Sequence, residues 1–192
     1  MRDNITAKVS RSRDVNMFGE LSHANYVLLD NAKRKHDGYF YEIVSCLIVA
    51  AFKHEAFINH LGYALLQNWN VFEHKSNSCK QNEILKEIGL SIDKNQRPFQ
   101  TLHDLFNARN ELAHGKPQLL THDSVVESGA REEMRRRKPL TKWESLCTLE
   151  FAQLAYDDTE EIAKLLWMSA GFDIHELYER SHSYSISMIH RP

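Results

Sequence analysis

The residues of this chain best suited to chemistry lie in one short segment, RNELAHG, at positions 109–115. An arginine binds an anion such as phosphate through parallel N–H donors and keeps its charge at neutral pH. A histidine gives or takes a proton near neutral pH, and an asparagine can orient the imidazole or bind a hydroxyl. Arg109, Asn110 and His114 are therefore candidates for anion binding and proton transfer.

A helix must position these side chains. Pro98 suits the first turn of a helix, and Gly115 followed by Pro117 is typical of a helix end. The sequence therefore predicts a helix from Pro98 to His114. This helix places each successive side chain about 100° further around its axis, which decides the direction of every candidate residue.

Two stripes are expected on this helix. The apolar stripe consists of Leu102, Leu105, Phe106, Leu112 and Ala113. Arg109 falls at its centre, where the charge needs a carboxylate, carbonyl groups or a bound anion. The neighbouring polar stripe consists of His103, Asn107, Asn110 and His114. The pattern predicts a core-facing cation beside a polar ridge.

Structural roles would account for the same residues. Glu55 lies at the edge of the apolar stripe of a predicted helix over residues 39–68, and it could pair with Arg109. The polar stripe could simply face solvent. His114 could do no more than interact with the negative end of its helix. In this interpretation the segment holds a buried cation and no site.

The same segment resembles the R-N-x-x-x-H signature of the HEPN superfamily of α-helical proteins. Arg109, Asn110 and His114 occupy the signature positions, and the histidine closes a helix just before a glycine. On the predicted helix 39–68, Glu55 and Asn59 resemble the acidic and amide positions of the family and project from one face. At the level of helix order, the resemblance covers about residues 18–170.

The resemblance implies a metal-independent endoribonuclease of a toxin or defence system. Cleavage by the ribose 2′-hydroxyl needs a base, an acid for the leaving 5′-oxygen and positive charge at the phosphate. It implies that His114 transfers protons, that Arg109 holds the phosphate and that Asn110 orients the imidazole or binds the 2′-hydroxyl. Supporting residues would be Glu55, Asn59, His103 and Asn107. The alternative is a non-catalytic HEPN-like scaffold or RNA-binding dimer.

Arg109 and His114 point about 140° apart on one helix, so they do not meet within one chain. The family's usual arrangement is a two-fold dimer, in which two motif helices face each other and each residue lies opposite its copy. We therefore expect a homodimer with RNA as its substrate. The toxin interpretation adds an antitoxin protein as a further partner.

Basic residues outside the motif give a weaker prediction of RNA contacts. These residues are Lys116, Arg135, Arg136 and Arg137. Lysines and arginines can follow a phosphate backbone, although a charge run of this kind is more often a solvated loop. The chain has no carboxylate cluster and no Cys or His spacing typical of a metal site, so neither a metal nor a cofactor is expected.

The remaining periodicity predicts an all-α, up-and-down helical bundle of HEPN type with two long antiparallel core helices and several shorter helices. Helices are expected over residues 18–35, 39–68, 81–88, 98–114, 143–170 and 173–179. No strand pair is convincing. Residues 1–16 are expected to form a flexible N-terminal arm, residues 17–180 one helical domain and residues 181–192 a C-terminal tail.

Composition limits the class of protein. A length of 192 residues with 42% hydrophobic and 26% charged residues fits one ordered domain. The net charge of -2 gives no overall attraction to nucleic acid, so any RNA contact must be local. Widely spaced cysteines fit a reducing compartment, and the apolar stretch 43–52 is too short for a membrane span. A cytoplasmic protein without a membrane role is expected.

Overall fold

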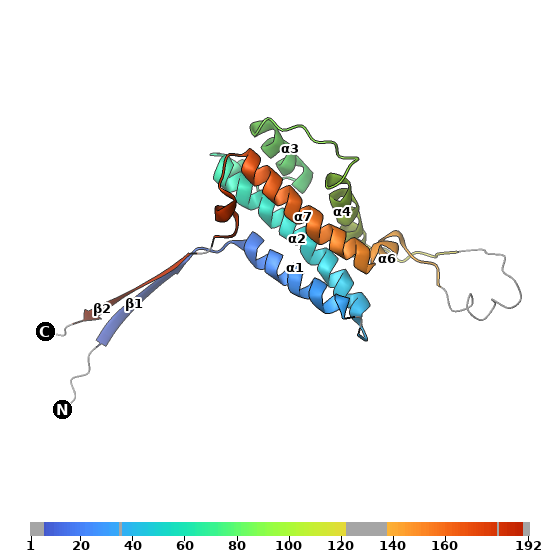
Figure 1. Cartoon of the computed structure of the whole chain (residues 1–192), viewed down its shortest axis with the longest axis horizontal. Helices are drawn as coiled ribbons and strands as arrows, with labels where there is room; N and C mark the ends of the chain where they lie inside the picture. Colours follow the sequence, from blue (N-terminus) through green and yellow to red (C-terminus); the bar gives the residue numbers. More distant parts are fainter. Residues whose placement is uncertain (1–5, 35, 122–137, 180, 190–192) are drawn as a thin grey trace, which may run out of the picture.

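The computed structural model of the chain describes residues 6–34, 36–121, 138–179 and 181–189. These residues are mostly helical, and a two-stranded ribbon projects from the helices (Figure 1). The α-helices are α1 (Met17–Lys33), α2 (Tyr39–Leu65), α3 (Asn77–Glu87), α4 (Phe99–Ala113), α6 (Lys142–Leu146) and α7 (Leu149–Ser169). Short 3-10 helices are η1 (Trp69–Val71) and η3 (Ile174–Tyr178), and the strands are β1 (Thr6–Arg13) and β2 (His182–Ile189).

Helix α2 is the central element of the bundle, and its apolar stripe was predicted from the sequence. It extends over 27 residues because no proline or glycine interrupts it before Gly62. Its side chains take part in two buried clusters, one around Leu47 and one around Phe57. Among the described residues no helix, α2 included, has both the length and the apolarity to cross a membrane.

The direction of α7 relative to α2 differs from the prediction. Phe18 at the start of α1 contacts Phe57 in the second half of α2, with ring centroids 5.4 Å apart, so α1 and α2 are antiparallel. Ala155 packs with the first half of α2 and Leu166 with its second half, so α7 runs in the same direction as α2 (Figure 1). The prediction that the two long helices, α2 and α7, are antiparallel is therefore wrong. Helix α4 comes between them in the chain and runs opposite to α2, so α7 returns in the direction of α2.

Two helix boundaries also differ from the prediction. The predicted helix over residues 143–170 is divided into α6 and α7, because the Thr148 hydroxyl accepts the Phe151 N–H at 3.1 Å and begins a new helix. Helix α3 begins at Asn77, earlier than predicted, because the Ser76 hydroxyl accepts the Cys79 N–H at 3.3 Å. Both differences result from side-chain caps.

The two ends of the chain form a sheet that was not predicted. Strand β1 pairs with β2 in antiparallel register, with Val9 opposite Ile186. The side chain of Asn16 brings the ends together by donating to the carbonyl of Leu177 at 2.9 Å. The prediction that these segments contain no strand pair is wrong, because pairing between distant segments leaves little local signal in the sequence.

Candidate functional site

The end of α4 presents the motif histidine. The helix ends at Ala113, one residue before the predicted end, and the His114 N–H donates to the carbonyl of Asn110 at 2.9 Å. A Cβ atom at Gly115 would lie 3.0 Å from the carbonyl oxygen of Glu111. The glycine therefore lets the chain leave the helix close to its last turn.

Arg109 is bound to the carboxylate that the sequence offered as its partner. Its Nη2 donates to Oε1 of Glu55 on α2. Its guanidinium lies over the Phe106 ring, with 5.1 Å between Cζ and the ring centroid. The side chains of Arg109 and Glu55 are 22% and 33% exposed. The pair is confirmed, but it lies at the surface of an open cleft instead of in the core.

This opening, here called the Arg109 cleft, has a volume of about 560 Å³ and lies between α2, α3 and α4. Its lining includes the candidate residues Glu55, Asn59, His103, Arg109 and Asn110. The structure thus brings together side chains from two predicted helices. His114 and Asn107 are not among the lining residues.

Three lysines that the sequence patterns did not single out also line the Arg109 cleft: Lys75, Lys80 and Lys94. Lys80 Nζ donates to Asn59 Oδ1 at 2.8 Å, so its hydrogen-bond partner there is neutral. Among the residues that the structure describes, Glu55 is the single carboxylate residue of the lining. The cleft therefore carries an excess of positive charge, although the whole chain has a net charge of -2. Such a local excess attracts anions.

The start of α3 adds to the positive electrostatic potential of the Arg109 cleft. Ser76, Asn77 and Ser78 line the Arg109 cleft, and Ser76 caps the helix. The positive end of the helix dipole is therefore close to the same space. Lys75 and Lys80 flank this helix start, so recognising Ser76 as a cap would have placed both lysines at the start of a helix, although not beside Arg109.

His103 is bound within the polar stripe. Its Nε2 lies 3.0 Å from Nδ2 of Asn107, one turn further along α4. An amide nitrogen can only donate, so Nε2 is the acceptor in this arrangement. Asn107 is exposed and can fix the ring of His103 without lining the cleft itself.

His114 lies in a second opening, here called the His114 cleft, with a volume of about 810 Å³. Lys116 and Trp143 also line it, and Asn110 lines both clefts. Arg109 and His114 of one chain therefore face different clefts on either side of Asn110. This separation agrees with the angle expected from their spacing on one helix.

The structure describes only one of the four basic residues outside the motif that were predicted to contact RNA. Lys116 lines the His114 cleft. Arg135, Arg136 and Arg137 lie outside the described residues. Lys138, at the end of the same charge run, donates to Glu144 Oε1 at 2.8 Å. That lysine contributes to the start of α6.

A buried histidine next to the site has a structural role. Burial lowers the pKa of His54 to about 3, so its imidazole is neutral at physiological pH. Its ring packs edge-on against Phe106, with centroids 5.8 Å apart. His54 therefore supports the ring under Arg109 and is not a candidate for proton transfer.

Comparison of the chain with protein-family models, curated proteins and solved structures gave no match. The resemblance to HEPN proteins therefore depends on the motif residues of α4 and on Glu55 and Asn59 of α2.

Proposed function

We propose that the chain is a metal-independent endoribonuclease of HEPN type, acting as a toxin or in defence. The observation that carries the proposal is the Arg109 cleft. There a partly exposed arginine, oriented by Glu55, lies among three lysines and faces one carboxylate. An open cleft with this charge fits a phosphate backbone better than a neutral substrate.

The proposed reaction is attack by the ribose 2′-hydroxyl on the adjacent phosphorus. The bond between phosphorus and the 5′-oxygen breaks, and a 2′,3′-cyclic phosphate forms. One histidine takes the 2′-hydroxyl proton and another protonates the leaving 5′-oxygen. His114 is the candidate for both roles, and Arg109 holds the phosphate as its charge increases. Asn110 orients the imidazole or binds the 2′-hydroxyl.

A second copy of the chain completes this mechanism. In one chain, Arg109 and His114 face different clefts and Asn110 lies between them. A two-fold contact along α4 would place the motif residues of two chains opposite each other and supply two histidines to one composite site. RNA is then the substrate, the second copy is an obligatory partner, and an antitoxin protein would be the regulatory partner of a toxin.

The dimer gives a testable prediction. Sedimentation velocity at low micromolar concentration should show a dimer, because obligate homodimers commonly bury more than about 2,000 Å². Replacing the exposed Asn107 of α4 by Arg should shift the protein toward monomer and reduce RNA cleavage in parallel. A wild-type monomer that cleaves RNA at full rate would refute the composite site.

The nuclease itself is tested by RNA cleavage in excess EDTA with wild-type protein and Arg109→Ala. Wild type should cleave, and Arg109→Ala should lose most of the activity. The variant should lose less than about 1 kcal/mol of stability, because Glu55 is exposed enough to be hydrated when its partner is removed. A pure wild-type protein that is folded and leaves RNA intact would contradict the proposal.

The Glu55–Arg109 ion pair also favours a second candidate function, a non-catalytic scaffold or RNA-binding dimer. An arginine bound to a carboxylate of another helix holds α2 and α4 together whether or not a substrate is present. In that case Arg109→Ala should lower the melting temperature while RNA binding persists without cleavage. The EDTA experiment therefore separates the two functions.

A further inference from the structure

The ribbon of β1 and β2 is an arm with a fixed base. The Asp14 N–H donates to the carbonyl of Ser181 at 2.9 Å, and Asn16 Nδ2 donates to the carbonyl of Leu177 at the same distance. Beyond this base the two strands project away from the helices (Figure 1). These two hydrogen bonds fix the base of the arm, and the strands beyond it are exposed to solvent.

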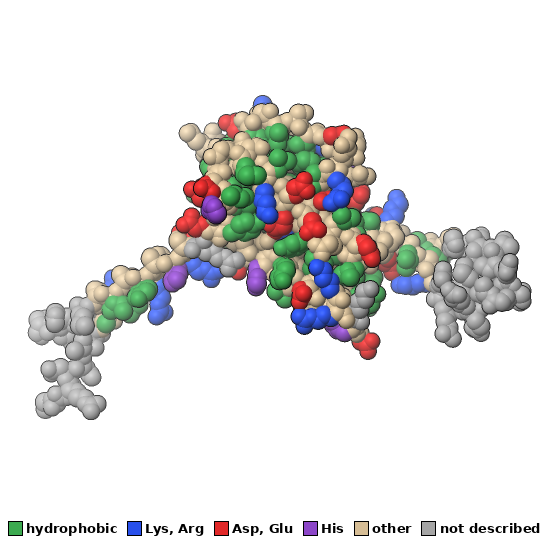
Figure 2. Space-filling view, viewed as in Figure 1, with side chains coloured by type: hydrophobic (Ala, Val, Ile, Leu, Met, Phe, Trp, Pro, Cys, Tyr) green, Lys and Arg blue, Asp and Glu red, His purple; other side chains and the backbone are tan. Residues whose placement is uncertain are grey.

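The arm is positively charged on an otherwise acidic chain. Its strands contain Lys8, Arg11, Arg13 and His182 and no Asp or Glu, whereas the whole chain has a net charge of -2. Arg13 donates to Glu20 at 3.0 Å. Among the described residues neither Lys8 nor Arg11 has an ion-pair partner. Blue side chains are seen along the arm in Figure 2.

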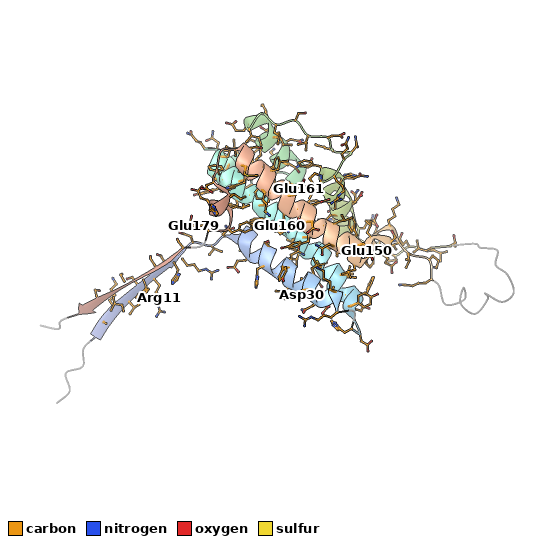
Figure 3. The ribbon with its side chains drawn as sticks, viewed as in Figure 1. Arg11, Asp30, Glu150, Glu160, Glu161 and Glu179 are labelled. Atoms are coloured by element: carbon orange, nitrogen blue, oxygen red, sulfur yellow. The ribbon has the colours of Figure 1, made fainter. Side chains whose placement is uncertain are left out.

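One face of the arm combines a cation with an exposed aromatic ring. Arg11 lies opposite Tyr184, and Val9 lies opposite Ile186, so these side chains share a face. Tyr184 is 70% exposed, and Ile186 is 61% exposed. Figure 3 shows Arg11 on the arm, away from the helices. The opposite face carries Lys8, opposite Ser187, and the hydroxyls of serine pairs such as Ser12 and Ser183, whose Oγ atoms are 2.7 Å apart.

We propose that this arm binds single-stranded nucleic acid. Proteins hold single strands with cations that follow the phosphates and with aromatic rings on which the bases stack. Arg11 would contact a phosphate on the face where Tyr184 stacks on a base, and Lys8, on the opposite face of the narrow ribbon, would contact a phosphate where the strand passes around its edge. A single strand fits better than a duplex, because paired bases keep their faces covered by their neighbours in the helix.

A second copy of the arm is a poorer occupant. Contact between two β1 edges would place Lys8 and Arg11 beside like charges, which destabilises strand pairing. Cationic side chains on an edge strand are a known means of preventing such pairing. The charge of the arm is complementary to phosphate and not to itself. The arm lies outside both clefts, and its binding of a single strand does not depend on cleavage.

The test uses fluorescein-labelled oligodeoxythymidine of about 15 nucleotides, which has no 2′-hydroxyl and so resists the proposed reaction. Binding is followed by anisotropy from ~50 mM salt upward. The variant Lys8→Thr with Arg11→Thr should bind at least about tenfold more weakly, with a salt slope smaller by about 1.4. Tyr184→Thr should bind about fivefold more weakly with an unchanged slope. Threonine keeps the strand propensity of each position.

The matched control is Lys33→Thr with Lys164→Thr, which removes the same charge from exposed positions of α1 and α7. This control should bind the oligodeoxythymidine at least about five times more tightly than the double variant Lys8→Thr with Arg11→Thr does. Equal affinity of wild type and both arm variants would refute the proposal, as would a wild-type dimer that Tyr184→Thr converts to monomer. Probe binding that depends on the arm in a protein without RNA cleavage would support the arm and refute the nuclease.

Discussion

His114→Ala is expected to reduce RNA cleavage by about 10²–10⁴-fold while leaving the melting temperature nearly unchanged. The reduction follows from the loss of the group that transfers protons. Stability should persist because His114 is exposed and its hydrogen bond to Asn110 is made by the backbone N–H, which alanine retains. A charged histidine at the end of α4 would contribute less than about 1 kcal/mol through the helix dipole.

The matched control for this prediction is His175→Ala in η3, an exposed histidine that lines neither cleft. Initial rates on a labelled RNA in EDTA should be unchanged in this variant. Full activity of His114→Ala, or an equal loss in His175→Ala, would remove His114 from the mechanism. A large loss of stability with unchanged activity would make His114 a structural residue.

Local periodicity was sufficient to predict the helices that carry the candidate site. The stripe of α2 and the proline and glycine that bound α4 gave both helices nearly to the residue. The Glu55–Arg109 pair could also be foreseen, because both residues lie next to apolar stripes that must face each other in a bundle. What the stripes could not show is that the pair lies in an open cleft.

The lysines of the Arg109 cleft could not be predicted in this way. Lys75, Lys80 and Lys94 line the same cleft as Arg109 because α3 packs against α2, and nothing local in the sequence fixes that packing. The arm was missed for a related reason. Its two strands lie at opposite ends of the chain, and their alternation of polar and apolar residues is short enough to be mistaken for a tail.

The division of the last long helix had a local signal. Thr141 and Glu144 form a capping box, in which each side chain accepts the backbone N–H of the other residue. This motif marks the start of α6, and Thr148 then caps α7. Apolar periodicity continues across both helices, so it concealed the break between them. Caps are therefore better guides to boundaries than periodicity in this part of the chain.

The largest expected effect on stability concerns a buried ion pair that connects the helices α1, α2 and α7 and the 3-10 helix η3. Lys53 of α2 is fully buried, and its Nζ donates to Glu160 Oε1 of α7 at 3.0 Å. Ser22 of α1 and Tyr178 of η3 also donate to this carboxylate. Figure 3 shows Glu160 on α7, on the side that faces α1. Every oxygen of the carboxylate is thus bonded inside the bundle.

Lys53→Met should destabilise the protein by about 3–5 kcal/mol at pH 7, because it leaves the Glu160 carboxylate buried without a cation. For a domain of this size the melting temperature should fall by about 6–20 °C. Adding Glu160→Gln should recover most of this loss, since glutamine is neutral, its amide oxygen still accepts from one of the two hydroxyls, and its amide nitrogen can donate to the oxygen of the other. Thermal unfolding of both variants beside the exposed control Lys164→Met measures the effect.

The pH dependence of this variant gives a second readout. Burial alone would raise the pKa of Glu160, but Lys53 and the two hydroxyls hold it below its ordinary value in the wild type. The pair therefore stabilises the wild type above the ordinary carboxyl pKa, and this contribution is lost as the pH falls through the lowered value. Without Lys53, burial raises the pKa of Glu160, so protonation relieves the buried charge. The deficit of Lys53→Met should shrink between pH 7 and pH 5, and a deficit that stays constant would show that lost packing, not the charge, is responsible.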